Sequence, residues 1–284
     1  MTPTLVRQHL PHAGTAPRVD VRARARDWSE IQERMLVPLY EAVYERLEVG
    51  PATRLLGLGC GSGLSLLMAA ARGATVTGVD ASPERMALAR ERLLPEAPGA
   101  RPWPHTRLVD GSPRDTAEPG APGYTLVTAF EPIGCLAGDS EGLGGLLAEA
   151  TPLAQRGAAV VLAGWGPPER CATASVMRVA TKLAEPLRTS GSWRPACRDD
   201  LEDVAQRAGL EPDGSGRVAC PFGYADVDSA VRGLKSTGLF DPAMTATDQV
   251  QVDKELVEAL HPHQRQDGTV WMPNVFRYLI ARTP

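Results

Sequence analysis

The stretch Arg54-Leu55-Leu56-Gly57-Leu58-Gly59-Cys60-Gly61-Ser62-Gly63 decides the fold of this chain. A short apolar run passes into alternating glycines, and residues 64–71 beyond them have a helical composition. This order predicts a strand, a tight glycine turn and a helix. Glycines let the backbone of such a turn approach a ligand closely, and the N–H groups that open the helix point toward it. We therefore expect a small ligand at this turn.

Strands and helices alternate on both sides of the turn. Before it, apolar residues three and four apart predict one long amphipathic helix over residues 27–48. After it, the sequence predicts strands over 74–80, 105–110, 124–130 and 158–164, and helices over 82–94 and 143–154. The helix at 82–94 has the clearest start, because Ser82 is a good N-cap and Pro83 suits the first helical position. The alternation predicts an α/β fold with a mostly parallel sheet.

The pattern changes after residue 164. Helices are predicted over 169–185, 198–208, 226–234 and 250–260, with a short strand over 216–219 and a closing strand over 274–282. Parts of this half are longer than a plain crossover needs. We interpret 165–200 and 221–270 as lid elements over the carboxyl ends of the strands, where open α/β sheets bind ligands. Residues 27–284 then form a single domain, and residues 1–26 a flexible N-terminal arm.

Composition excludes several classes of protein. The 284 residues are 43% hydrophobic and 23% charged, as in an ordinary globular protein, and no apolar run is long enough for a membrane span. A formal net charge of −4 argues against nucleic acid as a partner. Five cysteines without a CxxC pair argue against a disulfide framework or a structural zinc site, and fit a reducing cytoplasm. The start of the chain lacks the apolar core of a secretory signal.

The spacing of the glycines selects the cofactor class. Dinucleotide-binding proteins use G-x-G-x-x-G, which fails here in every register, so a nicotinamide-dependent oxidoreductase is disfavoured. The chain instead has G-x-G-x-G at Gly59, Gly61 and Gly63. Asp80 ends the next predicted strand 21 residues after Gly59, near the spacing expected of an acid that bonds ribose hydroxyls. Asp110, followed by Gly111, ends the strand after that.

With these motifs in order, residues 53–164 resemble the class I S-adenosylmethionine-dependent methyltransferases, and the overall pattern resembles bacterial small-molecule methyltransferases of secondary metabolism. The resemblance implies a Rossmann-like seven-stranded, mostly parallel sheet with an antiparallel last strand. It also implies S-adenosylmethionine as cofactor and S-adenosylhomocysteine as product. The implied cofactor-binding residues are Gly57, Gly59, Gly61, Gly63, Asp80, Ala81, Asp110, Gly111, Phe130 and Tyr40.

The resemblance assigns roles to these positions and exposes one departure. The glycines would face the methionine part of the cofactor, Asp80 would bind the ribose, and Asp110 would accept from the adenine amino group. The family usually has Asp or Glu where this chain has Gly57, so a carboxylate that helps to hold the cofactor's ammonium group is missing. Another group could substitute for it, and Trp28, Tyr40 or Tyr44 of the first helix could close over that end.

Candidates on the acceptor side follow the fourth and fifth predicted strands. Glu131 could pair with a cationic acceptor or take its proton, or it could cap the following helix. His263 could act as a general base near neutral pH, or it could be a solvated loop residue. The residues predicted to bind the acceptor are Glu131, Ile133, Trp165 and Tyr224. We expect no metal.

The sequence thus predicts methyl transfer from S-adenosylmethionine to O, N or C of a small, partly apolar molecule by in-line displacement. The alternative is a protein that keeps the cofactor fold without methylating, as a ligand sensor or a cyclase-like catalyst. No membrane partner is expected. The long first helix and the arm could pack on a second copy and form a homodimer.

Overall fold

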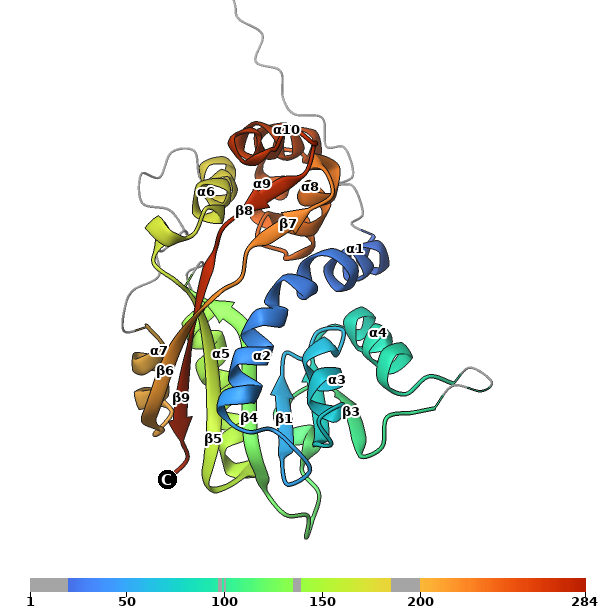
Figure 1. The fold of residues 1–284 in the computed structure, drawn as a ribbon, viewed down its shortest axis with the longest axis vertical. Helices are drawn as coiled ribbons and strands as arrows, with labels where there is room; N and C mark the ends of the chain where they lie inside the picture. The colour runs from blue at the N-terminus through green and yellow to red at the C-terminus, as the bar shows by residue number, and fades with distance from the viewer. Residues whose placement is uncertain (1–19, 97–98, 100, 135–138, 185–199) are drawn as a thin grey trace, which may run out of the picture.

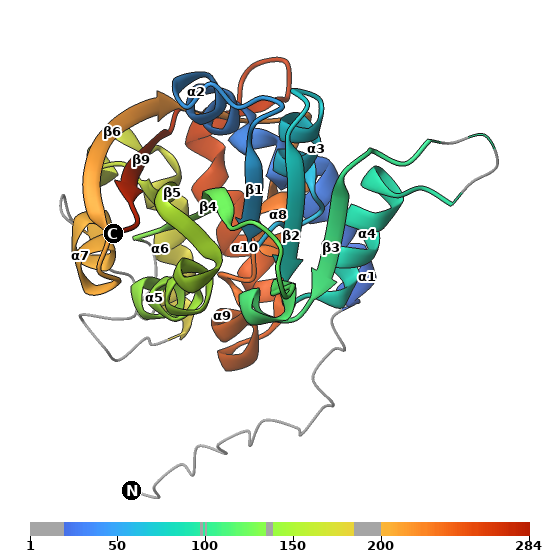
Figure 2. The ribbon, with the colours of Figure 1, turned by 90° about the horizontal axis from the view of Figure 1, so that it is seen from below.

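The computed structural model describes residues 20–96, 99, 101–134, 139–184 and 200–284. Across these residues, seven strands form one sheet in the order β3-β2-β1-β4-β5-β9-β6 (Figure 2). β9 pairs antiparallel with β5 and with β6, and the pairs among β1 to β5 are parallel. The predicted Rossmann-like sheet with an antiparallel last strand is confirmed. Its strands are β1 Arg54–Leu58, β2 Thr75–Asp80, β3 Thr106–Asp110, β4 Tyr124–Ile133, β5 Ala154–Trp165, β6 Glu211–Ala219 and β9 Val275–Arg282.

Helices cover both faces of the sheet. One face packs against α2 Val37–Arg46, α3 Leu64–Ala70 and α4 Pro83–Leu93, and the other against α5 Asp139–Ala150 and α7 Asp200–Arg207 (Figure 1). Successive residues of a strand point to opposite faces, so Leu55 joins the core under α2 and α3 while Leu56 joins the core under α5. Both leucines are fully buried. This double burial explains why the central strands are continuously apolar in sequence.

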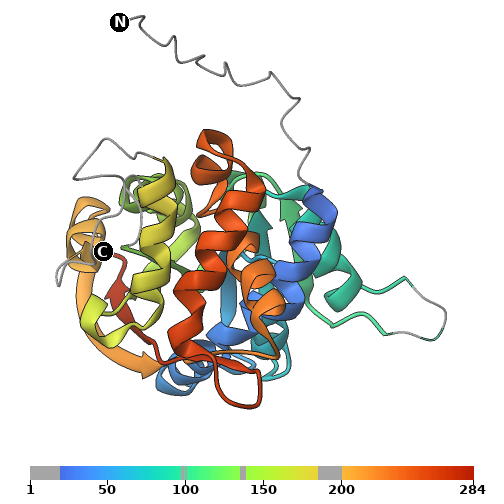
Figure 3. The ribbon, with the colours of Figure 1, turned by 90° about the horizontal axis from the view of Figure 1, so that it is seen from above.

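A third group of elements lies above the carboxyl ends of the strands, and we call it the cap (Figure 1). It consists of α6 Thr173–Ala184, β7 Phe222–Tyr224, α8 Val227–Ser236, α9 Asp241–Ala246, α10 Gln249–Leu260 and β8 Val270–Met272. Seen from above, α6, α10, α8 and α1 (Val21–Asp27) lie side by side (Figure 3). The cap occupies most of the two segments interpreted as lid elements, although residues 185–199 fall outside the described part of the chain. Every described helix is too short or too polar to span a membrane.

The N-terminal helix differs from the prediction. Residues 27–48 do not form one α-helix: α1 is followed by a π-helical turn, Trp28–Gln32, and a 3-10 turn, Glu33–Leu36, before α2 begins. Pro38 in the first turn of α2 gives a physical reason, since proline cannot continue the hydrogen-bond ladder of a preceding helix. The arm prediction was also wrong for residues 21–26, because Asp20 caps α1 by accepting from Arg22 and Ala23. Residues 1–19 lie outside the described part.

Element boundaries near the site shifted as well. β4 continues to Ile133, three residues beyond the prediction, and so carries Glu131 within the strand rather than in a loop. The helix predicted over 143–154 spans 139–150 instead. A 3-10 turn with Pro152 follows it, and residue 154 already belongs to β5. These shifts place α5 directly beside the end of β4.

Candidate functional site

The glycine turn between β1 and α3 is held open by backbone geometry that only glycine adopts easily. Gly59 and Gly61 both have φ of 58°, in the left-handed region. Asp80 at the end of β2 fixes the turn, because Oδ2 accepts from the N–H of Gly61 at 2.8 Å and Oδ1 accepts from the N–H of Ser82 at 2.8 Å. The acid predicted to bind ribose is thus buried against the turn, where each carboxylate oxygen keeps a lone pair for a further donor.

Glu33 closes the turn from the N-terminal segment. Its buried carboxylate accepts from the N–H of Ser62 at 3.1 Å and from the Ser62 hydroxyl, and it forms an ion pair with Arg92 at 3.0 Å. The start of α3 gains an anion where the helix dipole favours one. Sequence reasoning missed this contact, because Glu33 lies 29 residues before Ser62 and no local pattern connects them.

Leu66 occupies the place of the acid that the family usually has on β1. Gly57 pairs with Gly78 across β1 and β2, and Leu66 of α3 packs onto this glycine pair. A Cβ on Gly57 would lie 2.9 Å from Cδ2 of Leu66, and one on Gly78 would lie 2.3 Å from its Cδ1. The glycine at position 57, where the family usually has an acid, therefore allows Leu66 of α3 to pack closely on β1 and β2.

Gly63 serves packing as well. It is the N-cap of α3 with φ of 80°, and a Cβ there would lie 3.0 Å from Leu93 and 3.2 Å from Ala89 of α4. Its missing side chain lets two helices approach. That Gly63 also faces the methionine part of the cofactor with its backbone stays a prediction.

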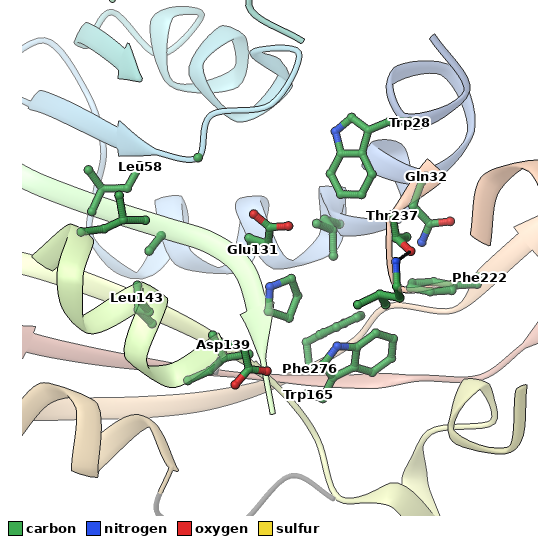
Figure 4. Close-up of a pocket in the computed structure, with 18 residues that line it drawn as sticks. Trp28, Gln32, Leu58, Glu131, Asp139, Leu143, Trp165, Phe222, Thr237 and Phe276 are labelled. Carbon is green, nitrogen blue, oxygen red and sulfur yellow. Dashed lines mark hydrogen bonds between the residues drawn. The ribbon is translucent and has the colours of Figure 1, made fainter. Parts of the chain in front are cut away.

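A cavity of about 360 Å³ lies between the carboxyl ends of the strands, the N-terminal segment and the cap (Figure 4). Its walls are mostly apolar, and the predicted residues Gly59, Glu131, Ile133 and Trp165 border it. Trp165 packs in an aromatic cluster with Phe276 at a ring separation of 4.6 Å and with Phe222 at 5.9 Å. The remaining lining residues are Trp28, Gln32, Leu36, Leu58, Ala129, Pro132, Asp139, Gly142, Leu143, Leu146, Thr237 and Leu239.

A second, much smaller cavity of about 20 Å³ lies on the other side of Gly59. Gly57, Gly59, Gly61, Tyr40 and Phe130 border it, so these predicted cofactor residues do converge. Tyr40 and Phe130 pack together at a ring separation of 4.8 Å and form its apolar wall.

Glu131 borders both cavities. The Glu131 residue is solvent-accessible because it faces the open cavity. The surrounding protein nevertheless partly desolvates its carboxyl group, and this desolvation raises the pKa of that group. Arg85 partly opposes this rise of the pKa, and Asp80 adds to it. Among the described residues, no hydrogen-bond or ion-pair partner of the Glu131 carboxylate is found.

Other predicted residues lie outside the two cavities. Asp110 stands in register with Asp80, but its exposed side chain pairs with Arg90 at 2.5 Å. Ala81 is exposed, and Gly111 has φ of 115° where a Cβ would lie 2.6 Å from Oδ2 of Asp115. Tyr224 lies behind the wall, where its hydroxyl donates to Oε1 of Gln32 at 3.0 Å.

His263 is also outside the site. It lies in a short 3-10 turn after α10, and burial lowers its pKa. The structure therefore brings only one of the two predicted catalytic residues, Glu131, to the cavity. Across the described residues, no three His, Cys, Asp or Glu side chains gather in a way that could hold a metal ion.

Comparisons with known proteins agree with this architecture. Residues 55–140 match the family described as "Methyltransferase domain". Three solved structures are similar: BH2331, a candidate methyltransferase from Bacillus halodurans C-125 (15% identity, TM-score 0.52, covering 86% of this chain and 98% of that one), YcgJ from Bacillus subtilis (15%, 0.51, 86% and 98%) and YjhP from E. coli (18%, 0.51, 92% and 99%). Identities this low show a shared fold alone. A search of curated proteins gave no significant match.

The family match identifies residues 55–140 as a methyltransferase domain, and the glycine turn, the acid at the end of β2 and the strand order agree with the class I S-adenosylmethionine-dependent methyltransferases. The chain carries this methyltransferase domain, and its cofactor is S-adenosylmethionine. The residues at the turn fit that cofactor: the glycines leave the backbone uncovered, Asp80 lies beside them, and the buried indole N–H of Trp28 finds no hydrogen-bond partner among the residues that the structure describes.

Proposed function

We propose that this protein transfers the methyl group of S-adenosylmethionine to a small, partly apolar molecule of secondary metabolism. The observation that carries this proposal is the mostly apolar, partly open cavity of about 360 Å³ that meets the glycine turn at Gly59. Binding sites for small molecules typically combine apolar walls with a few polar groups. Here the walls come from the sheet, α5 and the cap, and the polar groups include Gln32, Glu131 and Thr237.

The residues of this chain contribute mainly by positioning the acceptor and by excluding water from the cavity. When bound, S-adenosylmethionine supplies an electrophilic methyl group. Leu143, Trp165, Phe222 and Phe276 form apolar walls that exclude water and hold an acceptor in line with it. The cap covers this space, and the hydrogen bond from Tyr224 to Gln32 ties it to the N-terminal segment. We infer that the cap acts as a lid, as the sequence predicted.

The test uses S-adenosylmethionine with a deuterated methyl group and a pool of extracted bacterial metabolites. Mass spectrometry of the pool is expected to reveal a small molecule that carries the deuterated methyl group. If the protein bound S-adenosylhomocysteine but labelled nothing in chemically varied pools, the methylating function would be refuted. The alternative of a ligand sensor or cyclase-like catalyst would then hold.

A wall variant locates the acceptor. Leu146 borders the cavity from α5 and does not touch the glycine turn, so Leu146→Trp should narrow the acceptor space. We expect slower labelling of the identified acceptor and unchanged binding of S-adenosylhomocysteine. Val250→Trp is the control, because Val250 is 78% exposed on α10. Equal labelling by both variants would place the acceptor elsewhere.

A further inference from the structure

The region around Gly57 lacks the family's usual carboxylate, and Leu66 packs where that side chain would begin. The cofactor's amino-acid end nevertheless carries an ammonium and a carboxylate group, and burying either without a partner is unfavourable. Other groups of this chain must therefore meet those charges.

Glu131 offers a carboxylate at the right place. It comes from β4, the strand next to β1, and its Oε2 lies 3.6 Å from where a Cβ of Gly59 would be. The small cavity that it borders also touches Gly57 and is large enough for about one water-sized group. An ammonium group is of that size. Glu131 can thus reach from the neighbouring strand into the space beside the missing acid.

Trp28 offers a donor on the opposite wall. Trp28 is 8% exposed, and within the described part of the chain its Nε1 has no hydrogen-bond partner. This nitrogen lies 3.1 Å from where a Cβ of Gly61 would be. The Arg85 guanidinium stacks on the Trp28 ring at 4.3 Å and borders the same small cavity. Figure 4 shows Trp28 and Glu131 facing a common space from two different elements. A buried, unpaired N–H beside a cation is a site for an anionic oxygen.

Glu33, the other carboxylate beside the turn, is already satisfied. It accepts from the N–H and the hydroxyl of Ser62 and pairs with Arg92. Glu33 also borders the small cavity, and its Oε1 lies near Trp28 Nε1 beside Gly61, but its carboxylate is used in holding the turn. Among the described residues, the Glu131 carboxylate and Trp28 Nε1 border the same cavity without a hydrogen-bond partner.

We propose that Glu131 binds the ammonium group of the cofactor's amino-acid end and that Trp28, supported by Arg85, binds its carboxylate. The pair replaces the missing acid on β1 with one group from β4 and one from the N-terminal segment. Glu131 is then a cofactor-binding residue rather than the acceptor's base. This inference rests on the cofactor part of the proposed function, and binding measurements that need no acceptor keep the two apart.

The test is calorimetry with three ligands. S-adenosylhomocysteine carries the whole amino-acid end, 5′-methylthioadenosine lacks it, and decarboxylated S-adenosylhomocysteine lacks only the carboxylate. We expect Glu131→Gln to weaken S-adenosylhomocysteine about 10- to 100-fold and to leave 5′-methylthioadenosine unchanged, since a charged hydrogen bond is lost. Trp28→Phe should weaken S-adenosylhomocysteine about 5-fold and leave the decarboxylated ligand unchanged.

Matched controls separate binding from folding. Glu30→Gln changes an exposed acid of the same segment, and Trp271→Phe changes a tryptophan that also stacks with an arginine, Arg265, outside both cavities. Both controls should bind all three ligands normally. Equal weakening of S-adenosylhomocysteine and 5′-methylthioadenosine by Glu131→Gln would overturn the inference. So would normal binding together with abolished methyl transfer, which would make Glu131 the base. Either result would leave the proposed function of the unmodified protein standing.

Discussion

The contact between Glu33 and the glycine turn gives the sharpest prediction of stability. In Glu33→Gln the side chain keeps its size but loses its charge, so the ion pair with Arg92 disappears. Breaking a buried pair costs about 3 to 5 kcal/mol, and the lower end applies here because the Arg92 side chain is 24% exposed. For 284 residues the entropy of unfolding is about 0.6 kcal/mol/K, so a loss of about 3 kcal/mol lowers Tm by about 5 °C.

The assay is thermal unfolding followed by circular dichroism, with hydrogen exchange of residues 62–67 at the start of α3 as a local readout. Glu30→Gln, an exposed change in the same segment, should shift Tm by less than about 1 °C. Faster exchange at the start of α3 should accompany the loss of stability in Glu33→Gln, because the oxygen that accepts from its N–H groups loses its negative charge and binds them more weakly. The reasoning is refuted if both variants have the same Tm and the same exchange pattern.

Three further predictions follow from the site. Burial holds the pKa of the Glu131 carboxyl above its ordinary value in the free protein, and a bound ammonium group would lower this pKa again. Affinity for S-adenosylhomocysteine should therefore be full at pH values above the raised pKa and should fall as the pH decreases through that pKa. Glu131→Gln should remove this pH dependence. Calorimetry across a pH series checks the slope, and an unchanged slope in the variant would contradict it. Gly57→Ala should destabilise the fold by about 1 to 3 kcal/mol because its Cβ meets Leu66, and Leu66→Ala in the same chain should relieve part of that cost. Urea unfolding of the single and double variants measures this coupling, and simple additivity would argue against the contact. Asp80→Ala removes the acceptor of two backbone N–H groups, so it should lower stability by about 1 to 3 kcal/mol and abolish cofactor binding; normal calorimetric binding would refute the assignment.

The sequence determined the sheet and the cofactor class because both depend on short-range patterns. The apolar residues 55–58, the left-handed glycines and an acid at the end of the next strand lie close together in the chain, and each has a local physical requirement. The N-cap at Ser82 was predicted correctly for the same reason. The predicted boundaries of helices near prolines differed from the observed ones, as residues 37–38 and 151–154 show.

Only the tertiary structure decided how the site is completed. Leu66 packs on Gly57, where a larger residue would meet its side chain. Glu33 contacts Ser62, which lies 29 residues later in the chain. Phe222 and Phe276 pack against Trp165 from distant parts of the chain. The tertiary structure also brought Glu131 beside Gly59 and left His263 outside the cavities, which the residue types alone could not distinguish. The physical reason is that packing and charge compensation depend on which side chains meet in space, and the local sequence does not encode those meetings.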